Sequence, residues 1–174
     1  MNTFNNNKIK ISFIQHYILK YPVNPITYST FDELLELDNY DDIIYLKCIN
    51  NNLTSLSKLP NSLQYLLCYD NELSSLPKLP NSLQEIWCGY NNLTSLPELP
   101  DSLQQIWCHN NKLNSLPKLP DSLQTLHCNN NNLTSLPELP SNLKYLFCHN
   151  NKLNLIPNNL DQLSNLKIFR PMKV

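Results

Sequence analysis

The chain has 174 residues, a formal net charge of -1, thirteen prolines, six cysteines and one glycine. This length suits one domain, or one domain with a small cap. A net charge near zero argues against nucleic acid or an acidic membrane as the main partner. The sequence has no apolar run long enough for a membrane-spanning helix, and its first residues lack the pattern of a signal peptide. We therefore expect a cytoplasmic protein, in its own cell or in a host cell.

Residues 1–41 are expected to form an N-terminal cap with a disordered start. The isoleucines of residues 11–18 share one helical face. A capping-box pattern followed by leucines predicts a second helix over about residues 30–38. Apolar alternation over residues 9–13 would instead fit a strand. We favour two short helices.

From residue 42 onward, the sequence repeats every 20 residues. An asparagine follows each cysteine three residues later, a leucine follows two residues after that, and most units close on Leu-Pro-x-Leu-Pro. A fixed period of this length is the signature of stacked repeats. We divide residues 42–174 into six 20-residue units and a divergent terminal strand. The cysteines that mark the period are Cys48, Cys68, Cys88, Cys108, Cys128 and Cys148.

The repeated pattern L-x-x-L-x-C-x-x-N-x-L, seen over residues 63–73, resembles the leucine-rich repeat, with cysteine at the third apolar position. The 20-residue length and the Leu-Pro-x-Leu-Pro closure are similar to the short bacterial subtype of secreted effector proteins, and would suit a virus or an intracellular microbe. The resemblance covers roughly residues 42–170. It implies an α/β repeat solenoid, a horseshoe with a short parallel β-sheet on its concave face and a protein or peptide as ligand.

The residues predict this architecture independently. Side chains alternate along the stretch around each cysteine, so Leu66 and Cys68 would face the core. Adjacent units would place these strands in a parallel sheet, about 4.8 Å apart. The asparagine amide would pair with backbone groups of the turn. Proline disfavours helix in the Leu-Pro segments, which predicts an extended, polyproline-like convex side.

The last unit departs from the pattern. Residues 156–163 lack the second proline, which predicts a helical turn. Leu163, Leu166 and Ile168 then restore the spacing of a strand and would place Lys167 in the row that holds Phe147.

The outward side chains of the strands are the candidate functional site, because packing takes every inward position. They put both tryptophans and the three histidines of the repeats on one concave wall, about 29 Å wide. A row of exposed aromatic side chains indicates a binding surface, since Trp and Tyr dominate interface hot spots. The candidate partner-binding residues are Tyr65, Leu67, Tyr69, Trp87, Tyr90, Trp107, His109, His127, Tyr145, Phe147 and His149.

Other interpretations of this wall stay open. Rings of adjacent strands could stack on one another and stabilise the sheet. A carbohydrate could bind the same aromatic wall. A metal is disfavoured, because His109, His127 and His149 would lie too far apart to share one zinc ion. We expect His127 to be another flat ring between Trp107 and Phe147.

The sequence contains no motif for a nucleophile, a metal cluster or a phosphate-binding loop. We therefore expect a binding protein without enzymatic activity and without a cofactor. No catalytic domain is expected after the repeats.

The cysteines are expected to be reduced. All six would point the same way from one inward column, an arrangement that fits disulfide geometry poorly. Buried thiols that fill a core are typical of a reducing compartment. The Asn-Leu-Thr sequons at Asn52, Asn92 and Asn132 follow from the repeat consensus and do not by themselves indicate glycosylation.

Overall fold

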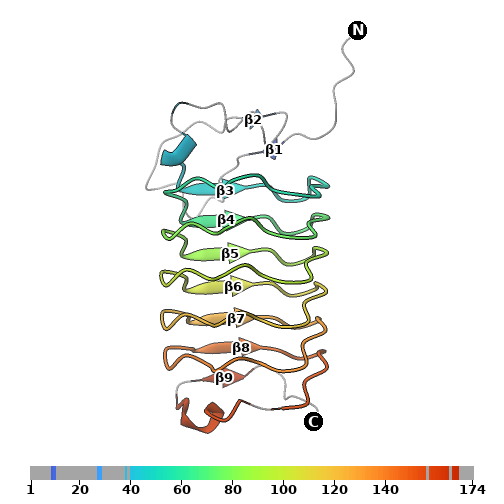
Figure 1. The fold of residues 1–174 in the computed structure, drawn as a ribbon, viewed down its shortest axis with the longest axis vertical. Helices are drawn as coiled ribbons and strands as arrows, with labels where there is room; N and C mark the ends of the chain where they lie inside the picture. Colours follow the sequence, from blue (N-terminus) through green and yellow to red (C-terminus); the bar gives the residue numbers. More distant parts are fainter. Residues whose placement is uncertain are drawn as a thin grey trace.

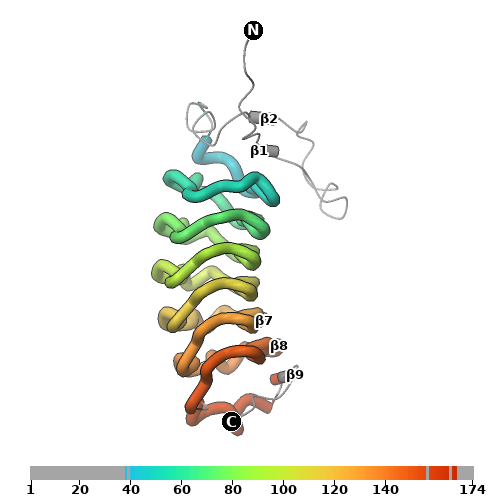
Figure 2. The backbone as a smooth tube through the Cα atoms, turned by 90° about the vertical axis from the view of Figure 1, so that its right-hand side faces the viewer, coloured from blue at the N-terminus to red at the C-terminus, as the bar shows by residue number. Residues whose placement is uncertain are grey.

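The computed structural model describes residues 9–10, 27–28, 38, 40–155, 157–164 and 166–168. Its main body is a stack of nearly parallel coils, each carrying one short strand (Figure 1). Figure 2, turned by 90°, shows the same coils as a regular series of loops. The repeat solenoid is therefore confirmed, whereas the strong curvature of a horseshoe stays a prediction.

Seven parallel strands form one sheet in chain order, so each coil pairs only with its neighbours. Consecutive strands from β3 to β8 pair in the register of the 20-residue period. The strands are β3 (Tyr45–Lys47), β4 (Tyr65–Leu67), β5 (Glu85–Trp87), β6 (Gln105–Trp107), β7 (Thr125–His127), β8 (Tyr145–Phe147) and β9 (Lys167–Ile168).

At the N-terminal end, β1 (Ile9–Lys10) and β2 (Thr27–Tyr28) form a separate antiparallel pair. Ile9 therefore lies in a strand, which was the alternative interpretation of this segment. The helices predicted over residues 11–18 and 30–38 lie outside the described residues, apart from Asp38. The part of the chain that the structure describes contains two 3-10 helices and no α-helix, and none of its helices is long and apolar enough to cross a membrane.

Leucines and cysteines fill the inside of the coils. Leu66 and Cys68 have no exposed surface, as predicted. On the opposite side, residues of the Leu-Pro segments such as Leu79 and Leu139 close the core. These segments contain neither helix nor strand, in agreement with the effect expected of proline.

The six cysteines are buried and free, as predicted. Burial raises the pKa of Cys48 and of Cys88 to about 12, so both are protonated thiols at neutral pH. Desolvation raises the pKa of the other four in the same direction. The column therefore consists of small apolar groups that pack the core.

An asparagine ladder joins the coils. Asn91 donates Nδ2 to the carbonyl oxygens of Cys68 and Cys88, at 3.0 and 3.2 Å, and its Oδ1 accepts the N–H of Leu73 at 3.0 Å. One buried side chain thus satisfies backbone groups of two successive coils, which confirms the role expected for it. Equivalent bonds are made by Asn71, Asn111, Asn131 and Asn151.

The register predicted for the last strand is wrong. Lys167 pairs with Tyr145, and Ile168 pairs with Leu146, so this coil is two residues longer than the units before it. The physical reason is η2 (Leu160–Gln162), because a 3-10 helix advances only about 2.0 Å per residue and more residues are needed to complete the circuit. Lys167 therefore belongs to the row of Tyr145 and not to that of Phe147.

Replacing Asn91 by alanine tests the asparagine ladder. The change leaves the N–H of Leu73 and the carbonyls of Cys68 and Cys88 without their amide partner. Since an unsatisfied buried group costs about 1–3 kcal/mol, we expect the free energy of unfolding, measured by urea denaturation, to fall by about 2–4 kcal/mol. Asn114→Ala, at an exposed site, should change it by less than about 0.5 kcal/mol. Equal losses in the two variants would contradict the ladder's role.

Candidate functional site

The outward side chains of β3 to β9, with the residues that follow each strand, form one surface that we call the sheet face. All eleven predicted site residues lie on this surface, on β4 to β8 or directly after those strands. Tyr90 is 56% exposed and Tyr145 38%, whereas Leu67 is only 4% exposed. Leu67 is therefore covered and offers little surface to a partner.

Four rings in the row before the cysteines form a continuous stack, here called the ring column: Trp87, Trp107, His127 and Phe147. Each pairs in register with the next. The ring centroids are 4.8 Å apart for the first pair, 3.7 Å for the second and 3.8 Å for the third, with interplanar angles of 25°, 17° and 27°. His127 is thus a flat ring between Trp107 and Phe147, as expected. The stacking covers the ring faces, so the exposed part of each half-buried ring is mainly its edge.

A second group of rings stands beside the column. The His109 ring makes T-shaped contacts with Tyr90 and with His127, with centroids 5.2 and 6.4 Å apart. Its imidazole lies over Gly89, where an added Cβ would approach Cε1 of His109 at 2.7 Å. Because Gly89 has no positive φ, this glycine is needed for the space it leaves and not for its backbone freedom. The only sign of this arrangement in the sequence is the chain's single glycine. The position of the His109 ring above Gly89 could not be inferred from the sequence.

The residues two places after the cysteines adopt the left-handed conformation, with φ between 51° and 58°. Asn and Asp enter this region readily, which accounts for five of the six residues in the row. Asn150 donates Nδ2 to Oδ1 of Asn130 at 2.7 Å, and Asn130 donates to Asn110 at 3.0 Å, so the amides form an outer ladder. The row is Asn50, Asp70, Tyr90, Asn110, Asn130 and Asn150.

The surroundings of His109 and His127 on the sheet face favour the neutral imidazole. Burial, together with smaller contributions from the neighbouring His109 and His149, lowers the pKa of His127 to about 4. Burial also lowers the pKa of His109. Burial raises the pKa of Glu85, and the contact with the Trp87 side chain offsets part of that rise. Among the described residues, no group of three His, Cys, Asp or Glu side chains is placed to hold a metal ion.

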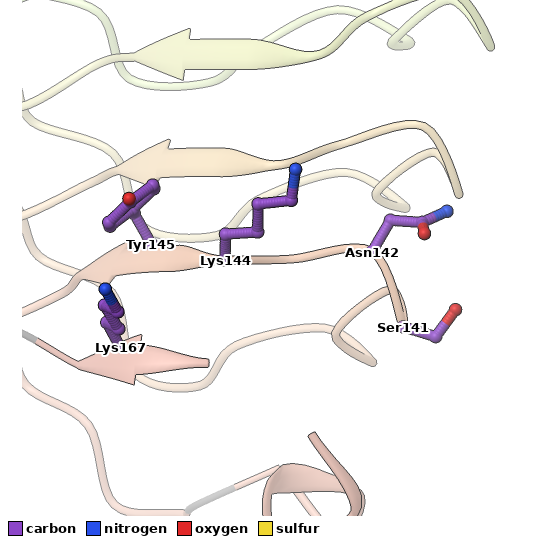
Figure 3. A pocket seen from close by; sticks show the side chains of 5 residues that line it. All are labelled: Ser141, Asn142, Lys144, Tyr145 and Lys167. Carbon is purple, nitrogen blue, oxygen red and sulfur yellow. The ribbon is translucent and has the colours of Figure 1, made fainter. Parts of the chain in front are cut away.

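A depression of about 290 Å³ lies at the C-terminal end of the sheet. Figure 3 shows its side chains spread along the strand edge and not converging on one point. Lys167 Nζ lies 5.9 Å from the centre of the Tyr145 ring, and Lys144 Nζ donates to Gln124 at 2.9 Å. This arrangement suits surface contacts better than the enclosure of a small molecule. The lining residues are Ser141, Asn142, Lys144, Tyr145 and Lys167.

One strand per coil, a parallel sheet in chain order and an asparagine ladder together define a leucine-rich-repeat solenoid. No protein-family model and no curated protein matches the sequence. Solved structures do match it. An effector leucine-rich-repeat domain from Shigella is 36% identical with a TM-score of 0.66, over 73% of this chain and 56% of that one. YopM from Yersinia enterocolitica is 32% identical with a TM-score of 0.56, over 75% of this chain and 34% of that one.

The chain is therefore a leucine-rich-repeat protein and matches the bacterial effector type. It spans about half of the Shigella structure and about a third of YopM.

A double-mutant cycle tests the packing of His109 over Gly89. In Gly89→Ala the new Cβ clashes with the imidazole, and overpacking of this kind costs about 1–3 kcal/mol in the free energy of unfolding. His109→Ala removes the ring, so adding Gly89→Ala to it should cost less than about 0.5 kcal/mol. Urea denaturation of the four proteins measures this coupling. Additive losses would show that His109 does not occupy the space above Gly89.

His127 should make stability fall in acid. The unfolded chain binds a proton on His127 near the ordinary pKa of 6.5, whereas the folded chain does so only near 4. The unfolded state therefore holds more protons between these values, and stability declines as pH falls through this window. His127→Phe keeps a flat ring in the column and removes the proton. Its loss of stability between pH 7 and pH 4.5 should be smaller than that of the wild type; identical losses would rule out the lowered pKa.

Proposed function

We propose that the chain is a non-enzymatic binding module that presents the sheet face to a protein or an extended peptide. The observation that carries the proposal is the ring column with Tyr69, Tyr90 and Tyr145 beside it, on one face of an interaction scaffold. Aromatic side chains lose little conformational entropy on binding and dominate interface energetics. In the ring column the stacking holds them in place before a partner arrives, which lowers the cost of binding further.

The geometry favours a peptide over a carbohydrate, which is the alternative ligand. Sugars pack on aromatic ring faces, but in the ring column the rings cover one another's faces. The exposed edges carry the positive part of the ring quadrupole and attract carbonyl oxygens. Side-chain amides such as that of Gln105, which donates to Glu85 and accepts weakly from Trp107, border the rings. An extended main chain supplies acceptors at regular spacing, and thus matches this row of edges.

We further propose that the protein works in the cytoplasm, of its own cell or of a host cell. The six free thiols support a reducing compartment. Their raised pKa also supports a non-catalytic role for the cysteines, because a protonated buried thiol is a poor nucleophile. The similar Shigella structure is the repeat domain of an effector protein, which is consistent with action on another cell.

Changing both tryptophans of the ring column tests the proposed function. The partner is first captured from the native cell and identified, and its affinity for purified variants is then measured by calorimetry. We expect the double variant Trp87→Ala, Trp107→Ala to bind at least about thirty-fold more weakly, as for hot-spot side chains. Trp87→Phe with Trp107→Phe keeps two flat rings and should lose less than about fivefold.

Two controls accompany this measurement. Urea denaturation shows whether the alanine variants are folded at the temperature of the binding assay. Leu155→Ala, at a 70% exposed leucine outside the strands, should leave the affinity unchanged. A folded double alanine variant that binds the partner as tightly as the wild type would rule out the sheet face as the binding surface.

A further inference from the structure

The outer amide ladder of the sheet face is interrupted at one place. It runs from Asn150 through Asn130 to Asn110 and then meets Tyr90, which has no amide with which to continue it. In the coil before Tyr90, the same position holds Asp70. Asp70 and Tyr90 are the two residues of this row that are not asparagine. The interruption lies beside the ring column, on the coils that carry β4 and β5.

Asp70 and Tyr90 are neighbours across these coils. The N–H of Asp70 donates to the carbonyl of Gly89 at 3.1 Å, and the N–H of Asn71 donates to that of Tyr90 at 3.1 Å. Their Cα atoms are therefore about one strand spacing, roughly 4.8 Å, apart. Both side chains are exposed. Within the described residues, the Asp70 carboxylate has neither an ion-pair nor a hydrogen-bond partner.

The Tyr90 ring is held in an exposed position at an energetic cost. Its backbone has a φ of 51°, a region that bulky side chains rarely enter. Its ring meets His109 at 86°, in an edge-to-face contact that fixes its direction. The imidazole of His109 is in turn accommodated by Gly89. An exposed aromatic ring held in a set orientation next to a free carboxylate is the arrangement that binds organic cations.

The charges near Asp70 also favour a cationic ligand. On the coils of β4 to β7 the charged groups of the sheet face are Asp70 and Glu85. Lys47 lies on the adjacent coil, paired with Leu67, and Lys167 lies at the far end of the sheet. Past the turn, exposed Glu72 follows Asp70, and Lys112 lies two coils further along the stack. The two charges that follow β4 on its own coil, Asp70 and Glu72, are thus both negative and complement a basic group.

We propose that Asp70 and Tyr90 form a subsite for a cationic side chain, arginine or lysine, of the protein segment that binds the sheet face. The carboxylate supplies the opposite charge, and the phenol ring supplies a face for the cation. Arginine fits best, because its planar guanidinium can stack on the ring and donate to the carboxylate together. This proposal rests on the proposed function and specifies the chemistry of the partner.

Two variants that restore the repeat consensus test the subsite. Asp70→Asn and Tyr90→Asn place asparagine where the other coils have it, so both should fold, and Tyr90→Asn gives the outer ladder a further amide. The probe is a nonapeptide of alternating arginine and serine, and its counterpart has glutamate in place of arginine. Glu98→Gln, at an exposed carboxylate on the Leu-Pro side, removes one charge as the matched control.

We expect the arginine peptide to bind the wild-type chain and the glutamate peptide not to. Each site variant should weaken binding by about two- to fivefold, the size of an exposed cation–π or ion-pair contact. Glu98→Gln should leave it unchanged. Amide chemical shifts in NMR spectra should move mainly at residues 69–71 and 89–91. Unchanged affinity in both site variants, or equal binding of the two peptides, would overturn the proposal.

The ring-column variants separate this result from the proposed function. If the two tryptophan changes abolish binding of the protein partner while both asparagine variants bind it and the arginine peptide normally, the cationic subsite is wrong and the proposed function stands. If the tryptophan changes leave partner binding intact, the proposed function is wrong. The peptide affinities of the asparagine variants then decide the subsite by themselves.

Discussion

The asparagine ladder is the interaction on which the other features of the stack depend. Each asparagine bonds carbonyl groups of its own coil and of the coil before it, so a change in coil length would move the amide away from its partners. Coil length is thereby fixed wherever a ladder asparagine follows. After Asn151, the described residues contain no further asparagine of this ladder. Asn159 bonds instead to Leu139, on the other side of the coil. The last coil was free to take two extra residues for this reason.

The fixed coil length also produces the ring column. In-register parallel pairing puts equivalent side chains one strand spacing apart, and this spacing is close to the stacking distance of aromatic rings. Trp107, His127 and Phe147 therefore stack without any special backbone feature. The same contact that stabilises the sheet presents a row of ring edges on its surface. Stability and binding are thus carried by the same side chains, and a variant must be assessed for both.

The features that follow from the period could be predicted from the sequence, and those that depend on local conformation could not. The strands, the inward Leu66 and Cys68, the free thiols and the row of rings all repeat every 20 residues. The register of β9 depends on a 3-10 turn that no periodicity encodes. The burial of Leu67 and the position of the His109 ring over Gly89 depend on how individual side chains pack, which the period does not encode. The left-handed row was foreseeable, because asparagine recurs at one position.

A nearly uniform repeat makes its irregular positions informative. The other coils show that asparagine at this row is sufficient for the fold, so the fold itself does not require Tyr90. Glycine in an extended segment costs about 0.5–1 kcal/mol, and a bulky residue in the left-handed region about 1–2 kcal/mol. Gly89 and Tyr90 carry both costs at consecutive positions, and together they set the orientation of the Tyr90 and His109 rings. The other coils fold without this orientation of the rings. Its effect is therefore on the surface of the protein, where the Tyr90 ring lies beside the carboxylate of Asp70.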